Sequence, residues 1–423
     1  MISFWRIFWL EFTGFVRSKS LALLIAASAA WMLGLPFVMK GDGTADGARE
    51  LYVHYSLGGA FALLVVALLA SATGSLARER EAKRLQLTLV RPVRYVLFVL
   101  GTILAQVAVG ALVLAVAGAA LAFKTDLARP CSHVLSPVLP SPREEAKAMY
   151  EAYMRAPETP EAVKKAKREI VLRLLENRAV DRYEVIQTNA TAKWSFGGME
   201  GSEVPEGVAV RMRFTNQYEM RQEVRGKFAL GDRSGVVSNI TQAVVTVPLA
   251  AETSGGERKA GTLTFENRGT SALMLRPRKD ISLLLPADGF GWNLCRAYVV
   301  LVAILAFVVS FGTFLSAGLG RPVALFVAFV TLIVGEMSPS VVSQYSNELE
   351  ASAADRMGLA ITRTAALVTR PVSAAAPLEA LAKDECVEPS AVLGLAASGL
   401  VLAPLLLALL SAAVLPRKQD DFA

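Results

Sequence analysis

Six long apolar stretches constrain the fold of this chain more than any other feature of its sequence. A helix needs about 20 apolar residues to cross a bilayer. The six stretches run from about Leu21 to Val38, Leu51 to Leu76, Tyr95 to Phe123, Trp292 to Leu315, Val323 to Val342, and Ala391 to Leu415. They predict an α-helical polytopic membrane protein with six transmembrane helices.

The composition agrees with this prediction and adds a second region. The 423 residues are 53% hydrophobic and 19% charged, and the mean hydropathy is +0.43. This is too apolar for a soluble protein and too charged for membrane spans alone. The net charge of +7 is modest and clusters at one predicted face. We read it as the positive-inside bias of a membrane protein, with no nucleic acid as partner.

The segment between the second and third stretches, residues 77–94, orients the chain. It begins as Arg78-Glu79-Arg80-Glu81-Ala82-Lys83-Arg84, turns apolar over Leu85 to Val90, and ends as Arg91-Pro92-Val93-Arg94. Basic side chains beside a span mark the cytoplasmic side, and a proline ends a short surface helix. With six spans both termini then lie in the cytoplasm, together with Arg321 in the short loop between spans four and five.

This segment resembles a motif of ABC-2 type transporter permeases, E-x-E-x-G-T-L-x-L-L-L-x-R-P-V-S-R, which lies between their second and third spans. The residues in register are Glu79, Glu81, Leu85, Leu87, Leu89, Arg91, Pro92, Val93 and Gly101. Lys83 and Arg84 stand where the family has Gly-Thr, and Tyr95 stands where it has the last Arg. Glu11 and Arg17-Ser18-Lys19 before the first span also resemble the family. The resemblance covers the membrane parts, a little over half of the chain.

The resemblance implies a non-catalytic permease subunit, in most family members an exporter, in the bacterial cytoplasmic (inner) membrane. It implies a second permease copy, as a homodimer or heterodimer, and a separate cytoplasmic ABC ATPase. The residues implied to couple to that ATPase are Glu79, Glu81, Leu85, Leu87, Leu89, Arg91 and Pro92. The chain has no G-x-x-x-x-G-K-[ST] motif, so ATP and Mg are expected on the partner and no cofactor is expected in this chain. The other interpretation of residues 77–94 is an ordinary basic loop.

A different class of function stays open at this point. The partner ATPase could drive a shape change that acts on a periplasmic partner, as in mechanotransmission or scaffold proteins, with no substrate moved. A membrane-anchored enzyme is a weak third reading, because HExxH, GxSxG and paired CxxC motifs do not occur in the sequence. His133 near Cys131 supplies two metal ligands, which do not make a site.

Changes in composition divide the chain into four regions. Residues 1–20 carry Trp and Phe side chains with scattered charges, which favours a helix in the membrane interface, although the first span could also begin early. Residues 21–123 hold spans one to three. Residues 124–288 form an insertion, and residues 289–423 hold spans four to six with an extracytoplasmic loop at 343–390. Membrane lipid surrounds the spans.

The insertion reads as an extracytoplasmic α+β domain. Ser141-Pro142 and Thr159-Pro160 are typical helix starts, so helices are expected to about Met154 and about Glu176. After Arg182 the apolar residues alternate with period two, and the strands separated by Gly and Asn turns predict an antiparallel β-sandwich. The predicted strands lie around Trp194–Phe196, Val208–Phe214, Val224–Leu230, Val244–Val247, Leu263–Phe265 and Ile281–Leu285.

Two residue pairs are further candidates. Arg296 in span four and Glu336 in span five lie at similar depth, so they either form an intramembrane charge pair or snorkel to the interface. Cys131 and Cys386 both lie on the oxidising side and are a possible disulfide. Cys295 is the competing partner, and free thiols are the remaining alternative.

Overall fold

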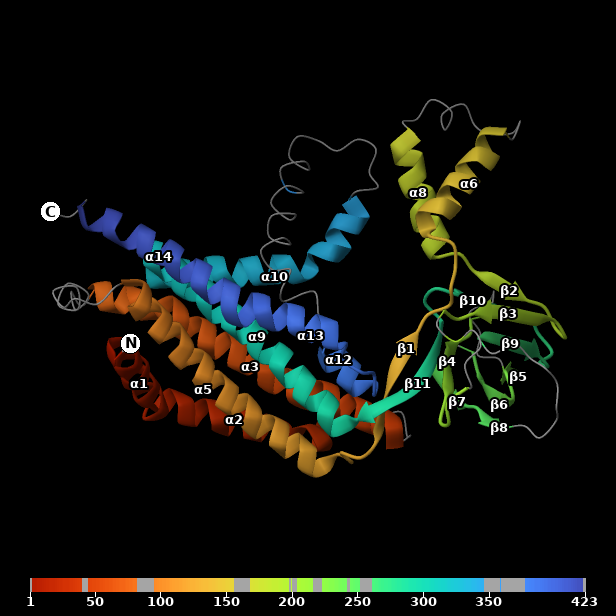
Figure 1. Ribbon diagram of the computed structural model, residues 1–423, viewed down its shortest axis with the longest axis horizontal. Coiled ribbons are helices and arrows are strands. Elements are labelled where there is room, and N and C mark those ends of the chain that lie inside the picture. Colours follow the sequence, from red (N-terminus) through yellow and green to blue (C-terminus); the bar gives the residue numbers. More distant parts are fainter. Residues whose placement is uncertain are drawn as a thin grey trace. The chain divides into compact units, whose positions relative to one another are not determined.

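The chain divides into a helical unit and an inserted unit built mainly of strands (Figure 1). The helical unit contains Met1–Arg129 and the helices from Gly289 onward, and the inserted unit contains Pro130–Asp288. The computed structural model describes residues 2–39, 45–81, 95–155, 168–197, 199, 204–215, 223–241, 244–251, 261–345, 358 and 377–420.

The helical unit contains both long and short helices. In chain order they are α1 (Ile2–Val16), α2 (Lys19–Val38), α3 (Ala45–Glu81), α5 (Tyr95–Lys124), α9 (Phe290–Gly318), α10 (Arg321–Tyr345), α12 (Pro377–Ala382), α13 (Pro389–Ala396), the π-helical segment η1 (Ala397–Leu402) and α14 (Ala403–Asp420). Between α9 and α10 only two residues intervene, which makes the hairpin predicted for spans four and five.

Five segments within the described residues are long and apolar enough to cross a membrane. They are Leu21–Val38, Gly47–Glu79, Tyr95–Lys124, Phe290–Gly318 and Pro389–Val414. The chain is therefore a multi-pass membrane protein. The predicted fifth span, Val323 to Val342, falls on the 25-residue helix α10. Its described apolar part, Arg321–Val334, is shorter than a span, so six spans remain a prediction.

The N-terminal region forms two helices and not one long span. The chain leaves helical geometry at Arg17–Ser18, and the Ser18 side chain caps α2 by accepting a hydrogen bond from the Leu21 N–H at 3.3 Å. A serine at this position satisfies one of the unpaired N–H groups of the first turn. In α1, Trp5, Trp9 and Leu10 are exposed. The break separates α1 from the first span, and the location of α1 in the membrane interface stays a prediction.

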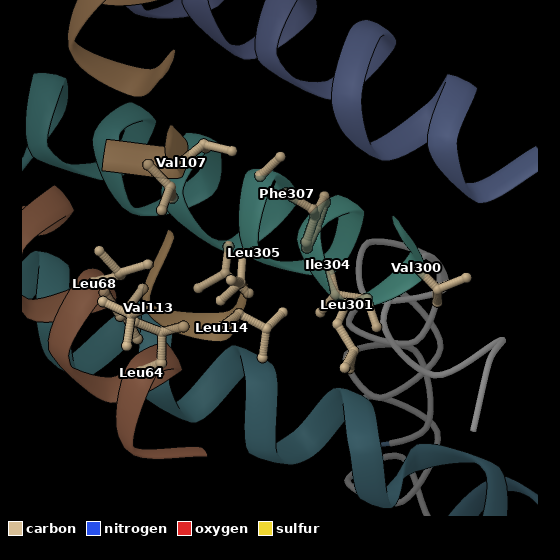
Figure 2. Packing of buried hydrophobic residues seen from close by; sticks show 14 of the residues in the cluster. Leu64, Leu68, Val107, Val113, Leu114, Val300, Leu301, Ile304, Leu305 and Phe307 are labelled. Carbon is tan, nitrogen blue, oxygen red and sulfur yellow. The ribbon is translucent and has the colours of Figure 1, made fainter. Parts of the chain in front are cut away.

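The core of the helical unit lies where α3, α5 and α9 pack together. Figure 2 shows aliphatic side chains from all three helices meeting in one cluster. Of its members, Leu64 and Leu68 come from α3, Val107 and Leu114 from α5, and Leu305 from α9. In a membrane such packing depends on close fit, because lipid tails are as apolar as these side chains.

The last span is interrupted by η1. Its Gly399 lies against the backbone of Ala303 in α9, where a Cβ would come within 2.6 Å of the Ala303 carbonyl oxygen. Only glycine permits this approach. A π-helical turn inside an α-helix has a wider backbone ring and is rare in proteins. The span therefore consists of α13 and α14 joined through a π-helical turn that packs on α9.

The inserted unit contains antiparallel sheets that share one core. The five-stranded sheet has the order β3 (Thr191–Ser195), β9 (Thr262–Asn267), β5 (Glu223–Leu230), β6 (Arg233–Ile240), β8 (Ala250–Ala251). The four-stranded sheet has the order β1 (Pro130–Leu135), β11 (Ile281–Gly289), β4 (Ala209–Arg213), β7 (Val244–Pro248), and β10 (Leu273–Leu275) pairs with β2 (Glu184–Ile186). These bounds cover the described residues.

Side chains from both larger sheets meet in one hydrophobic cluster. Phe228 from β5 and Phe265 from β9 are fully buried with their ring centroids 4.6 Å apart. Met212 from β4 and Leu283 from β11 belong to the same cluster. Alternate residues of β3, β4 and β9 are buried, as the period-two pattern predicted. The antiparallel sheets of the insertion therefore share a common core, and the β-sandwich stays a prediction.

The helix predicted after Ser141 is present as α6 (Pro142–Arg155). Its start is a capping box, since the Glu144 N–H donates to the Ser141 hydroxyl at 3.2 Å and the Ser141 N–H donates to the Glu144 carboxylate at 3.0 Å. The second predicted helix begins outside the described residues and continues as α8 (Arg168–Val180), four residues beyond the expected end. Val171 and Leu175 of α8 pack on Ala146 of α6.

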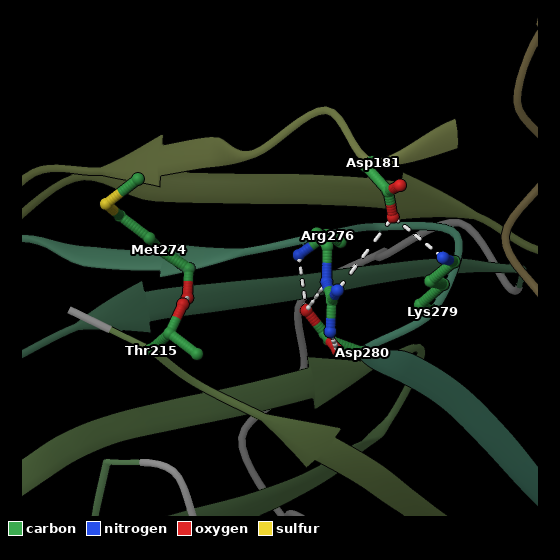
Figure 3. A network of polar contacts seen from close by, with 6 residues as sticks. All are labelled: Asp181, Thr215, Met274, Arg276, Lys279 and Asp280. Atoms are coloured by element: carbon green, nitrogen blue, oxygen red, sulfur yellow. Dashed lines mark hydrogen bonds and ion pairs between the residues drawn. The ribbon is translucent and has the colours of Figure 1, made fainter. Parts of the chain in front are cut away.

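A polar network fixes the turn between β10 and β11 (Figure 3). Asp280, with a side chain only 3% exposed, accepts hydrogen bonds from the Arg276 backbone N–H at 2.8 Å and from its guanidinium at 2.9 Å. Lys279 contacts Asp181, just after α8, at 2.7 Å. Because these groups bond within the turn or to Asp181, the network explains how the turn is held and indicates no ligand site.

Candidate functional site

The end of α3 carries the first residues of the sequence motif. The helix contains 37 residues, or about 55 Å at 1.5 Å per residue, which exceeds the ~30 Å hydrocarbon core. Arg78 donates from Nε to the Gly74 carbonyl at 2.9 Å. The side chain of Arg321, at the start of α10, also lies over Gly74. Two arginines, one from each predicted cytoplasmic segment, therefore meet at this end of the helical unit.

Helix α1 adds an acidic group to the same end. Burial raises the pKa of Glu11 above its ordinary value of 4.5, the nearby Glu79 carboxylate raises it further, and Arg78 lowers it. Ile7 of α1 packs against Gly101 of α5, where a Cβ would meet Ile7 at 3.0 Å. The N-terminal helix, the end of α3 and the beginning of α5 thus form one surface, which we call the motif-end surface.

Most of the predicted coupling residues cannot be placed on this surface. Glu79 lies in α3 and is half-buried. Glu81 is the last residue of α3, but its side chain lies outside the described residues. The remaining predicted residues, Leu85, Leu87, Leu89, Arg91 and Pro92, also lie outside the described residues.

The opposite end of the helices holds a cluster around Asp384, which sequence reasoning missed. Arg49, near the start of α3, donates from Nη1 to both carboxylate oxygens at 2.8 and 2.6 Å. Arg129, after α5, approaches the same carboxylate at 3.1 Å. The Arg49 guanidinium also lies 5.0 Å from the ring centroid of Phe290, the first residue of α9. One carboxylate therefore joins three elements distant in sequence.

Asn293 of α9 binds the segment that follows Asp384. Its side chain is fully buried, donates to the Glu385 carbonyl at 2.7 Å and accepts from the Val387 N–H at 2.8 Å. Asp384 itself adopts φ 55°, a left-handed conformation that Asp and Asn tolerate better than other residues with a side chain. The segment 384–387 is thus held by one buried amide and two arginines. We call this arrangement the Asp384 clamp.

An apolar pocket of about 380 Å³ opens between α3, α5 and α9. Its floor is made of the buried residues Leu57, Leu114 and Leu301, two of which are labelled in Figure 2. Its rim includes the exposed residues Ala115 and Cys295. The other lining residues are Gly118, Leu294, Tyr298 and Val299. The Tyr298 hydroxyl donates to the Ala111 carbonyl at 2.9 Å.

The predicted intramembrane charge pair remains untested. Arg296 is half-buried in α9, and its guanidinium lies 5.9 Å from the ring centroid of Trp292, one turn earlier. The Glu336 side chain in α10 lies outside the described residues. The pairing of Arg296 with Glu336 therefore stays a prediction.

The cysteines differ in state. Cys131 and Cys386, the two members of the predicted bridge, are both disulfide-bonded, whereas Cys295 is an exposed free thiol. This is the distribution that the predicted bridge requires, and it removes Cys295 as the competing partner. Among the described residues, no group of three or more His, Cys, Asp or Glu side chains is arranged to hold a metal ion.

Comparison with known proteins found no match: no family model, no curated protein and no solved structure matches this chain. The fold therefore defines the class of the protein by itself. It is a multi-pass membrane protein whose described residues include five long apolar helices and an inserted region of antiparallel sheets and helices.

Proposed function

We propose that this chain is the membrane-spanning permease subunit of an ABC-2 type transporter, an exporter powered by a separate cytoplasmic ATPase. In this proposal the insertion is extracytoplasmic, both termini are cytoplasmic, and a second permease copy completes the transport path. The chain performs no ATP chemistry of its own. ATP and Mg bind to the partner.

The observation that carries the proposal is the motif-end surface. A docking site for a motor must be stiffly connected to the spans, because a flexible connection would absorb the motion. Here α3 continues as one helix from the core to the first motif residues, and α1 packs on α5 beside it. Glu79 lies close enough to Glu11 to raise its pKa. A force applied at Glu79 therefore acts directly on two spans and on the N-terminal helix.

The alternative, mechanotransmission without transport, is favoured by a different observation. Several buried hydroxyls in the spans donate to carbonyls of their own helix, including those of Ser310 at 2.6 Å, Thr313 at 2.8 Å and Ser411 at 2.6 Å. Hydroxyls satisfied in this way do not line a polar path. Gln106 differs, because it is fully buried in α5 and its amide has no hydrogen-bond partner among the described residues.

The first experiment tests motor docking. Replacing Glu79 and Glu81 with lysine should abolish copurification of an ATP-binding protein, because it reverses both acidic charges of the motif at the end of α3. Glu50→Lys is the matched control, since Glu50 is exposed near the other end of the same helix. The control should retain the ATPase. Equal copurification with the double variant and the control contradicts docking at this surface.

A second experiment separates transport from mechanotransmission. With the ATPase bound, candidate substrates should stimulate ATP hydrolysis if the chain is a permease. Gln106→Leu should reduce that stimulation under the transport reading, because it removes a buried polar group from the bundle. Under the alternative the same variant should be stable and fully coupled, since an unsatisfied buried amide is costly and leucine has a similar volume. Basal ATPase activity controls for assembly.

A further inference from the structure

The apolar pocket between α3, α5 and α9 lies at a depth that suits a lipid chain. On α9 it extends from Leu294 to Leu301, a rise of about 10 Å along the helix. Gly118 on α5 lies six residues before Lys124, where that helix ends, or about 9 Å from its end. These positions fall within one half of the ~30 Å hydrocarbon core, the half nearer to the Lys124 end of α5.

The pocket is open and apolar. Its rim residues Ala115 and Cys295 are exposed, whereas Leu57 and Leu114 form a buried floor. Such walls offer few hydrogen-bond partners to water. Its volume of about 380 Å³ lies in the range of sites that bind small apolar ligands. In a bilayer the molecule that meets this rim is a lipid.

Two cations paired with aromatic rings lie on α5 and α9, two of the helices that form the pocket. The Lys124 ammonium lies 5.1 Å from the ring centroid of Tyr52, which joins the end of α5 to α3. Arg296, beside Cys295 in sequence, lies over Trp292. Aromatic and basic residues gather where spans meet the headgroup region, and basic groups there attract anionic headgroups. The charge at this level suits the phosphate of a lipid whose chain points toward Leu301.

We propose that this pocket binds one acyl chain of an anionic phospholipid, with the phosphate at the level of Lys124 and Arg296. The inference rests on the multi-pass membrane class of the chain and holds whether or not the chain is a permease. It assigns the pocket a role as a specific lipid site, distinct from the general contact of the spans with the bilayer.

The free thiol of Cys295 provides a native probe. Because Cys131 and Cys386 are disulfide-bonded, a maleimide reacts with Cys295 at the rim of the pocket. The full chain is purified in a steroid-glycoside detergent, which has no linear alkyl chain to occupy the pocket. The rate of Cys295 alkylation is then measured with and without 1-palmitoyl-2-oleoyl-phosphatidylglycerol. At a lipid concentration ten times the dissociation constant, occupancy should slow alkylation by about tenfold.

Two lipid controls identify what is recognised. Dihexanoyl-phosphatidylglycerol has the same headgroup without a long chain and should give little protection. Palmitoyl-oleoyl-phosphatidylcholine has the long chains but no net charge. It should protect Cys295 only at a higher concentration than palmitoyl-oleoyl-phosphatidylglycerol does. Equal protection by the short-chain lipid overturns the chain-binding proposal, and equal protection by the two long-chain lipids overturns the preference for an anionic headgroup.

A filled pocket provides the protein control. A Cβ on Gly118 would meet nothing within 4 Å, so Gly118→Phe places a ring in open space. This variant should react slowly with or without lipid, and native mass spectrometry should show one tightly bound lipid fewer. Val116→Phe, at an exposed position of the same helix outside the pocket, should behave like the wild type. Lipid protection that persists in Gly118→Phe overturns the proposal. Protection of Cys295 that increases with protein concentration also overturns it, because a second copy of the chain would then cover the thiol.

Discussion

Replacing Asp384 with asparagine removes the charge of the Asp384 clamp and little else. Asparagine has the same shape and also tolerates the φ of 55° that this position requires. The change leaves Arg49 without its carboxylate. Two further donors of Arg49, Nε and Nη2, are already buried and have no hydrogen-bond partner within the described part of the chain. The variant therefore tests whether one carboxylate holds the segment 384–387 to the helices.

The magnitude follows from the exposure of the pair. The side chains of Arg49 and Asp384 are 17% and 20% exposed. Breaking a fully buried pair costs about 3–5 kcal/mol, and an exposed pair contributes at most about 1 kcal/mol. A mostly buried pair should lie between these limits, at about 2–3 kcal/mol. That is roughly a 30- to 150-fold increase in local opening, since about 1.4 kcal/mol is a factor of ten.

Hydrogen exchange of the Val387 amide measures this opening, because its N–H donates to Asn293 within the clamp. Asp384→Gly also removes the carboxylate and also tolerates the φ of 55°, so it should raise exchange at least as much as Asp384→Asn does. Glu379→Gln is the control. It breaks the exposed ion pair with Lys383 nearby, whose side chains are 55% and 38% exposed. If Asp384→Asn raises exchange no more than this control does, the clamp does not hold the loop.

Three further predictions concern pH, the cysteines and topology. Burial raises the pKa of Glu11, so the folded state binds this proton more tightly than the unfolded chain and stability falls as pH rises through the raised pKa. Glu11→Gln should remove this fall from a plot of melting temperature against pH, and an unchanged plot contradicts the burial of Glu11. Alkylation without reductant should label Cys295 alone by mass spectrometry, and labels on Cys131 and Cys386 exclude their bridge. A reporter fused after Ser234 should be active only outside the cytoplasm and one at Ala423 only inside, and any other pattern contradicts the six-span topology.

Five of the six predicted spans are present among the described residues, because length and hydropathy determine spans, but the ends of helices follow other forces. The second span was expected over Leu51 to Leu76, and the helix α3 runs from Ala45 to Glu81. Arg, Glu and Ala are good helix formers, so the helix continues after the apolar residues stop. Hydropathy predicts which residues lie in the bilayer, but it does not predict where the helix that contains them begins and ends.

In the insertion, strands with clear alternation were predicted and the others were missed. The sequence Arg233–Ile240 has no clean alternation, yet it forms β6 along the full length of β5. Gly231, with φ 57°, makes the tight turn that brings the two strands together. Pairing imposed by a neighbouring strand overrides a weak local pattern.

The Asp384 clamp could not be predicted for a related reason. Asp384 lies in a loop without periodicity, and its partner Arg49 is 335 positions away in the sequence. A single acidic residue in such a loop has no local signal of its role. The cluster exists only because the packing of α3, α5 and α9 brings distant segments to one end.

The π-helical segment η1 changes the direction in which side chains point along the last span. A π turn takes in one residue more than an α turn does, and one residue corresponds to about 100° of rotation. Residues of α13 and α14 that share a stripe on a uniform helical wheel therefore point in different directions on either side of Gly399. Deleting one residue from Ala397–Leu402 should restore a regular helix and leave the side chains of α14 pointing as they do now, because the π turn absorbs that one residue. The same deletion within the regular helix α14 should instead turn everything after it by about 100° and change which side chains face α9.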